Sequence, residues 1–324
     1  MAKYLVTGAA GFIASRVIAQ LIEGGDQVLG IDNLCPTYDV RMKEYRIKQL
    51  KQKSGFTFYP FDICDRLKLN SLCSAEKFDA VINLAARAGV RASVQNPWAF
   101  VDTNMTGTLN LLESCRQNGI SKFILASTSS IYGEHAPIPT PETANSDLPL
   151  QPYSASKKGA EAMCHAYHHL YGVDVTIFRY FTVYGPAGRP DMVMFRFVQW
   201  IKEGRTVHLN GDGNQSRGFT YVDDIARGTI LGLKPVGYEI INLGGHEVIT
   251  INEMIGRLEK ILGEKARVEH HPLHIADMMV NQADVQKAKR LLDWEPRVGL
   301  DEGMQRVCDW YLKERGFASQ IMTD

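Results

Sequence analysis

A tyrosine and a lysine stand four residues apart, as Tyr153 and Lys157, at the start of a long helical pattern. At this spacing the two side chains lie on one face of a helix, which puts an ammonium group beside a phenol. A phenol is a poor base at neutral pH because its pKa is normally near ~10, but a positive charge about 4 Å away favours the phenolate by roughly 4 kcal/mol. A bound nicotinamide cation would act in the same direction. The pair could therefore take a proton from an alcohol. Such pairs also occur by chance on surface helices, so the surrounding sequence has to distinguish a catalytic pair from a chance one.

A glycine-rich turn follows the first predicted strand. Gly8 permits a tight turn, Gly11 lets backbone amides approach a pyrophosphate at the start of the next helix, and Ala14 allows that helix to lie close to the sheet. The second predicted strand ends at Asp32, where a carboxylate can accept hydrogen bonds from both ribose hydroxyls of an adenosine and would repel a 2′-phosphate. The turn and the acid together predict a binding site for NAD rather than NADP.

Apolar strand patterns alternate with helical patterns along the first half of the chain. The predicted strands comprise residues 4–7, 27–31, 56–59, 80–84 and 122–126. This alternation predicts an α/β protein with a doubly wound parallel sheet of the Rossmann type. Ligands bind such sheets beyond the carboxyl ends of the strands. We therefore expect Asp62 and Ile63 beside an adenine, and the small Ala85 and Ala86 where a cofactor crosses the sheet edge, although each could also be an ordinary strand-end residue.

The composition is that of an ordinary globular protein. Of the 324 residues, 45% are apolar and 22% charged, and Lys plus Arg equal Asp plus Glu at 36 each. This balance predicts no attraction to nucleic acid or to an anionic membrane, and no apolar run approaches the ~18 residues of a spanning helix. The N-terminus shows no secretory signal pattern, and the six cysteines have no metal-ligand spacing. We expect reduced thiols, a cytoplasmic location and small-molecule partners.

Two groups of histidines have spacings that a metal site could use. They are His165, His168 and His169 on one predicted helix, and His270, His271 and His274 further along the chain. No acid or cysteine completes either group in the sequence. Both therefore read as surface or interface histidines, and we expect no metal ion.

The chain resembles the extended short-chain dehydrogenase/reductase family. The resemblance rests on segments that occur in the family's order and spacing: Gly8-x-x-Gly11-x-x-Ala14, Asp32, residues 83–86 (Asn-Leu-Ala-Ala), residues 127–133 (Ser-Thr-Ser-Ser-Ile-Tyr-Gly) and Tyr153-x-x-x-Lys157. It implies an NAD-binding Rossmann domain over residues 1–180, with a returning segment near 217–247. A smaller, interleaved α/β domain over residues 181–324 would bind a UDP-sugar. The resemblance also implies a homodimer.

The resemblance assigns roles to individual residues. Tyr153, Lys157 and Thr128 correspond to the catalytic residues, with Thr128 as the hydroxyl partner of the tyrosine. Asn104, inside a predicted helix, is expected to support the cofactor site as a backbone clamp. The implied cofactor-binding residues are Gly8, Gly11, Phe12, Ile13, Asp32, Asn33, Asp62, Ile63, Leu84, Ala85, Ala86, Asn104, Tyr153, Lys157 and Tyr180.

Within the family, residues 179–192 are most similar to nucleotide-sugar epimerases that act on UDP-glucuronate. This similarity implies reversible epimerisation at C4, giving UDP-galacturonate through a transient 4-keto sugar, with NAD bound. A guanidinium is a forked, permanently charged donor, so Arg189 suits the sugar carboxylate. Gly218 stands where the family usually has an acid, after an arginine that matches the family residue at the diphosphate. The implied substrate-binding residues are Ser129, Ser130, Thr182, Arg189, Arg217 and Asp277.

Two further functions stay open. UDP-glucose or UDP-N-acetylhexosamine 4-epimerases are the nearer alternative, although UDP-glucose 4-epimerases usually have Asn where Thr182 stands. A non-catalytic NAD-binding protein is the remote alternative, and such a protein would usually lack a tyrosine at position 153. Sugar 4,6-dehydratases and UDP-glucuronate decarboxylases are set aside, because they usually carry an acid about two residues after the catalytic hydroxyl, where this chain has Ser129 and Ser130.

Overall fold

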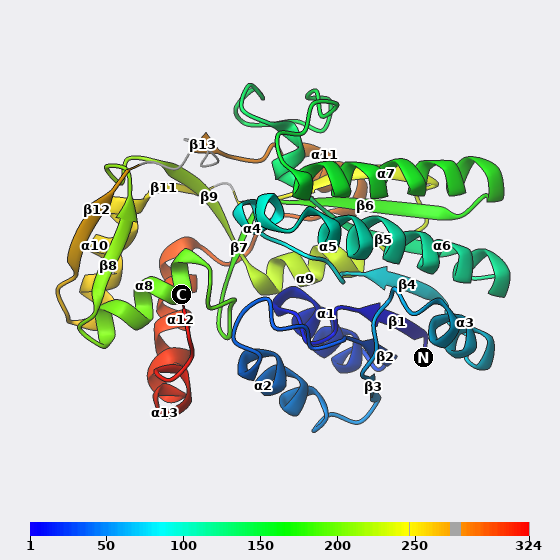
Figure 1. Ribbon diagram of the computed structural model, residues 1–324, viewed down its shortest axis with the longest axis horizontal. Helices are drawn as coiled ribbons and strands as arrows, with labels where there is room; N and C mark the ends of the chain where they lie inside the picture. Colours follow the sequence, from blue (N-terminus) through cyan, green and yellow to red (C-terminus); the bar gives the residue numbers. More distant parts are fainter. Residues whose placement is uncertain (246, 273–279, 324) are drawn as a thin grey trace.

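The computed structural model describes residues 1–245, 247–272 and 280–323 (Figure 1). Within these residues seven parallel strands form one large sheet in the order β10-β6-β5-β4-β1-β2-β3. The strands are β1 (Lys3–Thr7), β2 (Gln27–Ile31), β3 (Phe56–Tyr59), β4 (Ala80–Asn83), β5 (Lys122–Thr128), β6 (Asp174–Tyr180) and β10 (Tyr238–Leu243). The prediction of a doubly wound parallel sheet is confirmed.

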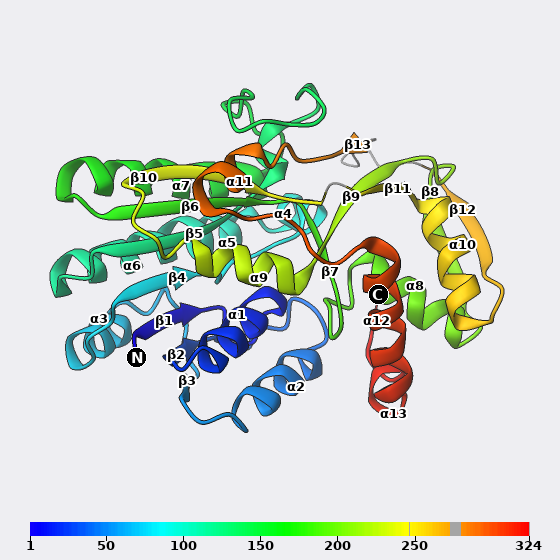
Figure 2. The ribbon, with the colours of Figure 1, turned by 180° about the vertical axis from the view of Figure 1, so that it is seen from behind.

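Alternate residues of the strands enter two different cores, one on each face of the sheet. Val6 packs with helices α1, α2, α9 and α11, whereas its neighbour Leu5 packs with α3, α6 and α7 on the other face (Figures 1 and 2). The helices are α1 (Phe12–Glu23), α2 (Arg41–Leu50), α3 (Arg66–Ala75), α6 (Gly107–Asn118), α7 (Pro152–Tyr171), α9 (Val222–Leu231) and α11 (Gln286–Leu292). Because both faces are covered, the strands are continuous apolar runs.

Helix α7 carries the tyrosine and lysine pair, and local signals define both of its ends. Pro152 occupies its first turn, where the missing amide proton costs nothing. Gln151 and Ser154 form a capping box at its start. At its end Gly172 has φ of 69°, a left-handed conformation that favours glycine. The positions of Tyr153 and Lys157 in the first two turns therefore follow from local sequence.

The helical pattern over residues 98–118 contains a break in its regular winding. It consists of α5 (Pro97–Val101), a π-helical turn (Asp102–Thr106) and α6, and the short α4 (Val90–Gln95) precedes it. A π-helical turn adds a residue to the helix and changes the directions of the side chains around it. Asn104 lies in this turn.

A second apolar core lies to one side of the large sheet, at the left in Figure 1. Its elements, and the short helices and strands around it, are β7 (Thr182–Tyr184), α8 (Val193–Lys202), β8 (Thr206–Asn210), β9 (Ser216–Tyr221), β11 (Val248–Thr250), α10 (Ile251–Leu262), β12 (Arg267–His271), β13 (Val280–Asn281), α12 (Leu300–Lys313) and α13 (Arg315–Ala318). β9 pairs with β7, β11 and β13, and β8 pairs in parallel with β12. The division into domains at residues 180 and 181 stays a prediction. None of the described helices is both long and apolar enough to cross a bilayer.

Candidate active site

A cavity of about 1010 Å³ lies where the large sheet meets the second core. It is the structural setting for nearly all of the residues that the sequence singles out. The predicted site residues that line it are Gly8, Gly11, Phe12, Ile13, Asp32, Asn33, Asp62, Ile63, Leu84, Ala85, Ala86, Thr128, Ser129, Ser130, Tyr153, Lys157, Tyr180, Thr182, Arg189 and Arg217. Asn104 does not line it, and Asp277 lies outside the described residues. Residues as far apart in the chain as Gly8 and Arg217 thus share one cavity.

The glycine turn after β1 is packed tightly against the end of β4. Gly8 has φ of 69°, and a Cβ there would lie 2.8 Å from backbone atoms of Ala85. A Cβ on Gly11 would lie 2.8 Å from the carbonyl oxygen of Gly8. Larger residues at either position would force the turn apart. The backbone at the start of α1 is therefore open to close approach by a ligand.

Asp32, at the end of β2, fixes this turn from the side. Its Oδ2 accepts a hydrogen bond from the backbone N–H of Ala10 at 3.1 Å, and its Oδ1 accepts one from Leu34 at 2.8 Å. Further along the cavity, Asn33 Nδ2 donates to Asp62 Oδ2 at 2.6 Å. A carboxylate has about four lone-pair sites, so Asp32 can still accept from a ligand.

The tyrosine and lysine of α7 differ in their surroundings. Lys157 is buried, with its Nζ donating to the carbonyl oxygen of Ala126 at 2.7 Å. Burial lowers the pKa of Lys157 to about 8, and the negative charge of Glu161 opposes this shift. Burial raises the pKa of Tyr153 above its ordinary value, while a hydrogen bond with Thr128 and the charge of Arg189 act against the rise.

This arrangement corrects one expectation from the sequence. The helical spacing predicted that Lys157 would lower the pKa of Tyr153, but the cation that lowers it here is Arg189, which follows β7. The physical reason is that the Lys157 ammonium is held by the carbonyl oxygen at the end of β5. In the protein alone the phenol therefore stays protonated at neutral pH, and a further positive charge in the cavity would be needed to favour the phenolate.

A buried ion pair connects α7 to the strands beneath it. Arg179 Nε and Nη2 donate to the two carboxylate oxygens of Glu161 at 3.0 and 2.7 Å, and each side chain is 2% exposed. Ser127 Oγ also donates to Glu161, at 2.6 Å. Glu161 lies one helical turn beyond Lys157, so this pair positions the catalytic face of the helix. The sequence analysis did not identify Glu161, because its partner lies 18 residues away on another element.

Asn104 lies behind the cavity rather than in its wall. Its Oδ1 accepts from the backbone N–H of Arg87 at 2.9 Å, and its Nδ2 donates to the carbonyl oxygen of the same residue at 3.1 Å and to Ser156 Oγ at 2.9 Å. Ser156 Oγ in turn donates to the carbonyl oxygen of Tyr153 at 2.7 Å. Asn104 therefore clamps Arg87 to α7, as expected, but does not line the cavity as a cofactor-binding residue would. The reason is that the π-helical turn directs its amide toward α7.

Arg46, on α2, joins two loops of the cavity and was missed by the sequence analysis. It is buried and donates to the carbonyl oxygens of Ala10, in the glycine turn, and of Ala187 and Gly188, each between 2.9 and 3.0 Å. It also donates to Tyr38 Oη at 2.8 Å. No local signal marks this residue, because α2 reads as a solvated surface helix.

Arg189, at the end of the loop that Arg46 holds, has its own partners. Its Nε and Nη2 donate to the two oxygens of Asp191 at 3.1 and 2.5 Å. Its guanidinium lies 5.8 Å from the ring centre of Tyr38. Because Asp191 is more exposed than Arg189, a ligand carboxylate in the cavity could take over one side of the guanidinium fork.

The backbone is closely packed at Gly218, next to Arg217 in the wall of the cavity. A Cβ on Gly218 would lie 2.9 Å from the carbonyl oxygen of Gly245, so a larger residue there would force the backbone apart. Arg217, beside it, lines the cavity and donates to the carbonyl oxygen of Ser216 at 2.8 Å. Asn281 Nδ2 donates to Ser129 Oγ at 3.2 Å, and the sequence analysis did not identify Asn281.

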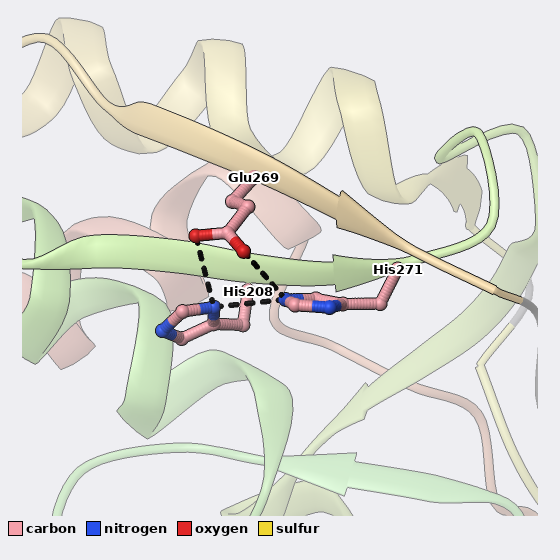
Figure 3. A group of neighbouring side chains, drawn as sticks. All are labelled: His208, Glu269 and His271. Atoms are coloured by element: carbon pink, nitrogen blue, oxygen red, sulfur yellow. Dashed lines mark hydrogen bonds and ion pairs between the residues drawn. The ribbon is translucent and has the colours of Figure 1, made fainter.

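The predicted histidine groups are only partly described, because His274 lies outside the described residues. His165 and His168 pack around the ring of Tyr238, with ring centres 5.0 and 5.6 Å away. His271 lies beside His208 and Glu269, so an acid does complete a histidine group (Figure 3). The expectation that no acid would do so is wrong, because β8 and β12 bring together residues about 60 positions apart.

Comparison with known proteins adds four findings. Residues 4–244 match the model of the NAD dependent epimerase/dehydratase family. The chain is 54% identical to UDP-glucuronate 4-epimerase of Thermodesulfobacterium geofontis, over 96% of each chain. It superposes with a TM-score of 0.90 on a UDP-glucuronic acid 4-epimerase from Bacillus cereus, solved with UDP-glucuronic acid and NAD, at 37% identity and covering 96% of this chain and 99% of that one. A UDP-glucose 4-epimerase from Thermotoga maritima, solved with UDP-glucose, also gives 0.90, at 33% identity over 97% and 99%.

Proposed function

The chain belongs to the NAD-dependent epimerase/dehydratase family, and from this membership we infer that it is a UDP-glucuronate 4-epimerase. It interconverts UDP-glucuronate and UDP-galacturonate by inverting C4 through a transient 4-keto sugar, with NAD as cofactor. The fold alone does not separate glucuronate from glucose, since both kinds of epimerase superpose equally well. The observation that carries the substrate assignment is a cationic residue, Arg189, in the cavity beside Tyr153.

The described residues fit the cofactor. The Gly8 and Gly11 positions leave no room for side chains, so backbone amides at the start of α1 can meet a pyrophosphate. Asp32 has free acceptor sites for ribose hydroxyls and disfavours a 2′-phosphate. When bound, NAD⁺ supplies a reversible hydride acceptor for C4.

We assign the proton transfer at C4 to Tyr153. Its hydroxyl lines the cavity and shares a hydrogen bond with Thr128, which keeps the phenol in place and lowers its pKa. Lys157, one turn further along α7, holds the end of β5 through Ala126, and we assign it to positioning this face of the helix. The diphosphate is assigned to Arg217. Asp277 remains part of the proposal from the sequence resemblance alone.

The carboxylate of the sugar must be held as well as recognised. A 4-keto uronate is a β-keto acid, and it loses carbon dioxide most easily when the bond to the carboxylate stands perpendicular to the carbonyl plane. Arg189 and Thr182, with Ser129 and Ser130, would keep the carboxylate out of that geometry. Asn281 fixes the Ser129 hydroxyl and so belongs to the same wall.

Replacing Arg189 with His should raise the KM for UDP-glucuronate by about 10- to 100-fold, because a charged, forked hydrogen bond is lost. It should also release a measurable share of UDP-pentose, detectable by chromatography of the products. Asp191→Asn is the matched control: it removes the negative charge that pairs with Arg189 inside the chain but leaves the guanidinium, so KM should not rise. An unchanged KM and product mixture in the Arg189 variant would contradict the carboxylate assignment.

The experiment that tests the function is proton NMR of UDP-glucuronate incubated with the purified protein, with and without added NAD⁺. The galacturonate anomeric signal should appear. A parallel sample with UDP-glucose separates the alternatives: turnover of UDP-glucose alone would indicate the neutral-sugar epimerase, and turnover of neither sugar would indicate a non-catalytic NAD-binding protein.

We also propose that the protein is a homodimer and lies in the cytoplasm. Exposed apolar side chains gather near α4 and α5, where Trp98 is 77% and Val94 64% exposed, and such patches mark interaction sites. Leu170 and Tyr171, at the end of α7, are exposed as well. The six free thiols support a reducing compartment.

A substitution tests the dimer. Trp98→Asp should convert the dimer to a monomer in size-exclusion chromatography with light scattering, because the change puts a charge into the apolar contact. Leu67→Asp on α3 is the control, since Leu67 is 79% exposed but distant from this patch in sequence and on another helix. A dimer that survives the Trp98 change and not the Leu67 change would place the interface elsewhere.

A further inference from the structure

Three side chains with metal-ligand chemistry lie on one face of the ribbon formed by β8 and β12. The two strands are parallel, and their register pairs Glu269 directly with His208 and His271 with Asn210. Residues opposite each other in a sheet share a face, and so do residues two apart on one strand. The grouping of His208, Glu269 and His271 therefore follows from the backbone pairing and does not depend on a chosen side-chain rotamer.

The ligand atoms are already close to the spacing that a metal ion requires. His208 Nδ1 lies 2.9 Å from His271 Nε2, while Glu269 oxygens lie 3.8 Å from the first nitrogen and 3.6 Å from the second (Figure 3). An ion bound tetrahedrally at about 2.0 to 2.2 Å from each ligand atom holds those atoms roughly 3.3 to 3.6 Å apart. The two Glu269 distances belong to its two different oxygens; with one oxygen and the two nitrogens, all three ligand atoms lie within 4.8 Å of one another. Rotation of these exposed side chains would bring the three atoms to three corners of such a site.

The surroundings hold one side of the group and leave another side open. The ring of His208 packs edge-on against Trp200 at 5.7 Å between ring centres, and Trp200 is buried with its Nε1 bonded to Thr323 Oγ1 at 3.0 Å. The three side chains are between 39% and 58% exposed, so water can complete the coordination. His270, between Glu269 and His271 in β12, faces away and lies with its Nδ1 2.9 Å from the carbonyl oxygen of Gly211.

We propose that His208, Glu269 and His271 bind one divalent transition-metal ion, with Zn²⁺ as the best match, and a water molecule in the fourth position. Two imidazoles and a carboxylate suit Zn²⁺, whereas Mg²⁺ prefers oxygen ligands alone. The ion joins β8 to β12 through side chains, and it lies at the edge of the large cavity because His208 also lines that cavity. This site is independent of the proposed epimerase function.

The test uses the untagged full chain after treatment with a chelator, titrated with Zn²⁺ alone by calorimetry. One ion should bind per chain, and His271→Ala or Glu269→Gln should weaken binding at least 10-fold, while the matched control His270→Ala keeps the wild-type affinity. Tetrahedral Co²⁺ absorption without a thiolate charge-transfer band would further support the site, and Mg²⁺ should not compete.

Equal affinities for the His270 and His271 variants would overturn the proposal, as would the absence of a stoichiometric binding event in the wild-type chain. Circular dichroism checks that each variant is folded. All three ligands are partly exposed, so their replacement should leave the fold intact. A thiolate charge-transfer band would assign the ion to cysteine and would also reject this site.

Discussion

Replacing Tyr153 with Phe should lower kcat for UDP-glucuronate epimerisation by about 10²- to 10⁴-fold, the range that a positioned acid or base supplies. The change removes only the hydroxyl, and the ring keeps its edge-on contact with Phe100, with 6.0 Å between ring centres. KM should therefore change little, and the effect should appear in kcat and kcat/KM alike. The measurement is initial-rate kinetics on wild type and variant with saturating NAD⁺.

The matched control removes the same atom at a different buried site. Tyr132 Oη donates to Asn242 Oδ1 at 2.7 Å and does not line the large cavity. Tyr132→Phe should cost about 1 kcal/mol of stability and leave kcat within a small factor of wild type. If the Tyr153 variant also kept its kcat, the assignment of the base would be wrong.

The pH dependence of kcat follows from the same phenol. Its pKa lies above the ordinary value because burial outweighs the hydrogen bond with Thr128 and the charge of Arg189. A base must be deprotonated to accept a proton, so kcat should rise as the pH rises from neutral toward the pKa. The Tyr153→Phe variant should lose this dependence in its residual activity.

Local rules of the sequence were enough to find the centre of the site. The spacing of Tyr153 and Lys157 within one helix, the glycine turn and the acid at the end of β2 each depend on a few neighbouring residues. The fold predicts where such segments meet, since the carboxyl ends of parallel strands share one edge. The cavity accordingly contains Gly8, Asp32 and Tyr153 together.

Side-chain contacts between elements far apart in the chain could not be predicted in this way. Arg46 reaches three carbonyl groups through the packing of α2 against two loops, and Glu161 meets Arg179 through the order of α7 and β6. His208 meets His271 through the pairing of β8 with β12. In each case the residue types are visible in the sequence, but the contact depends on tertiary structure. For Lys157, the helical spacing was right while the direction of the ammonium was decided by Ala126.

Replacing Glu161 with Gln should have the largest effect on stability, with the free energy of unfolding falling by roughly 3 to 5 kcal/mol. The substitution leaves the Arg179 guanidinium buried without its counter-charge and removes a charged acceptor from Ser127. Urea unfolding of both proteins at neutral pH, followed by circular dichroism, measures the difference. Glu113→Gln is the matched control, because Glu113 also binds an arginine through two hydrogen bonds, to Arg116 at 2.9 Å each, but is 30% exposed. That variant should lose less than about 1 kcal/mol.

The same substitution should also act on the catalytic helix through charge. The carboxylate of Glu161 raises the pKa of Lys157, which burial lowers to about 8, so its removal moves that pKa further down. Lys157 then loses its proton at a lower pH, and any decline of kcat on the alkaline side should begin at lower pH than in wild type. A stability loss without this displacement would mean that Glu161 only holds α7 on the sheet. The displacement together with the loss would show that one buried carboxylate both fixes the helix and keeps Lys157 charged.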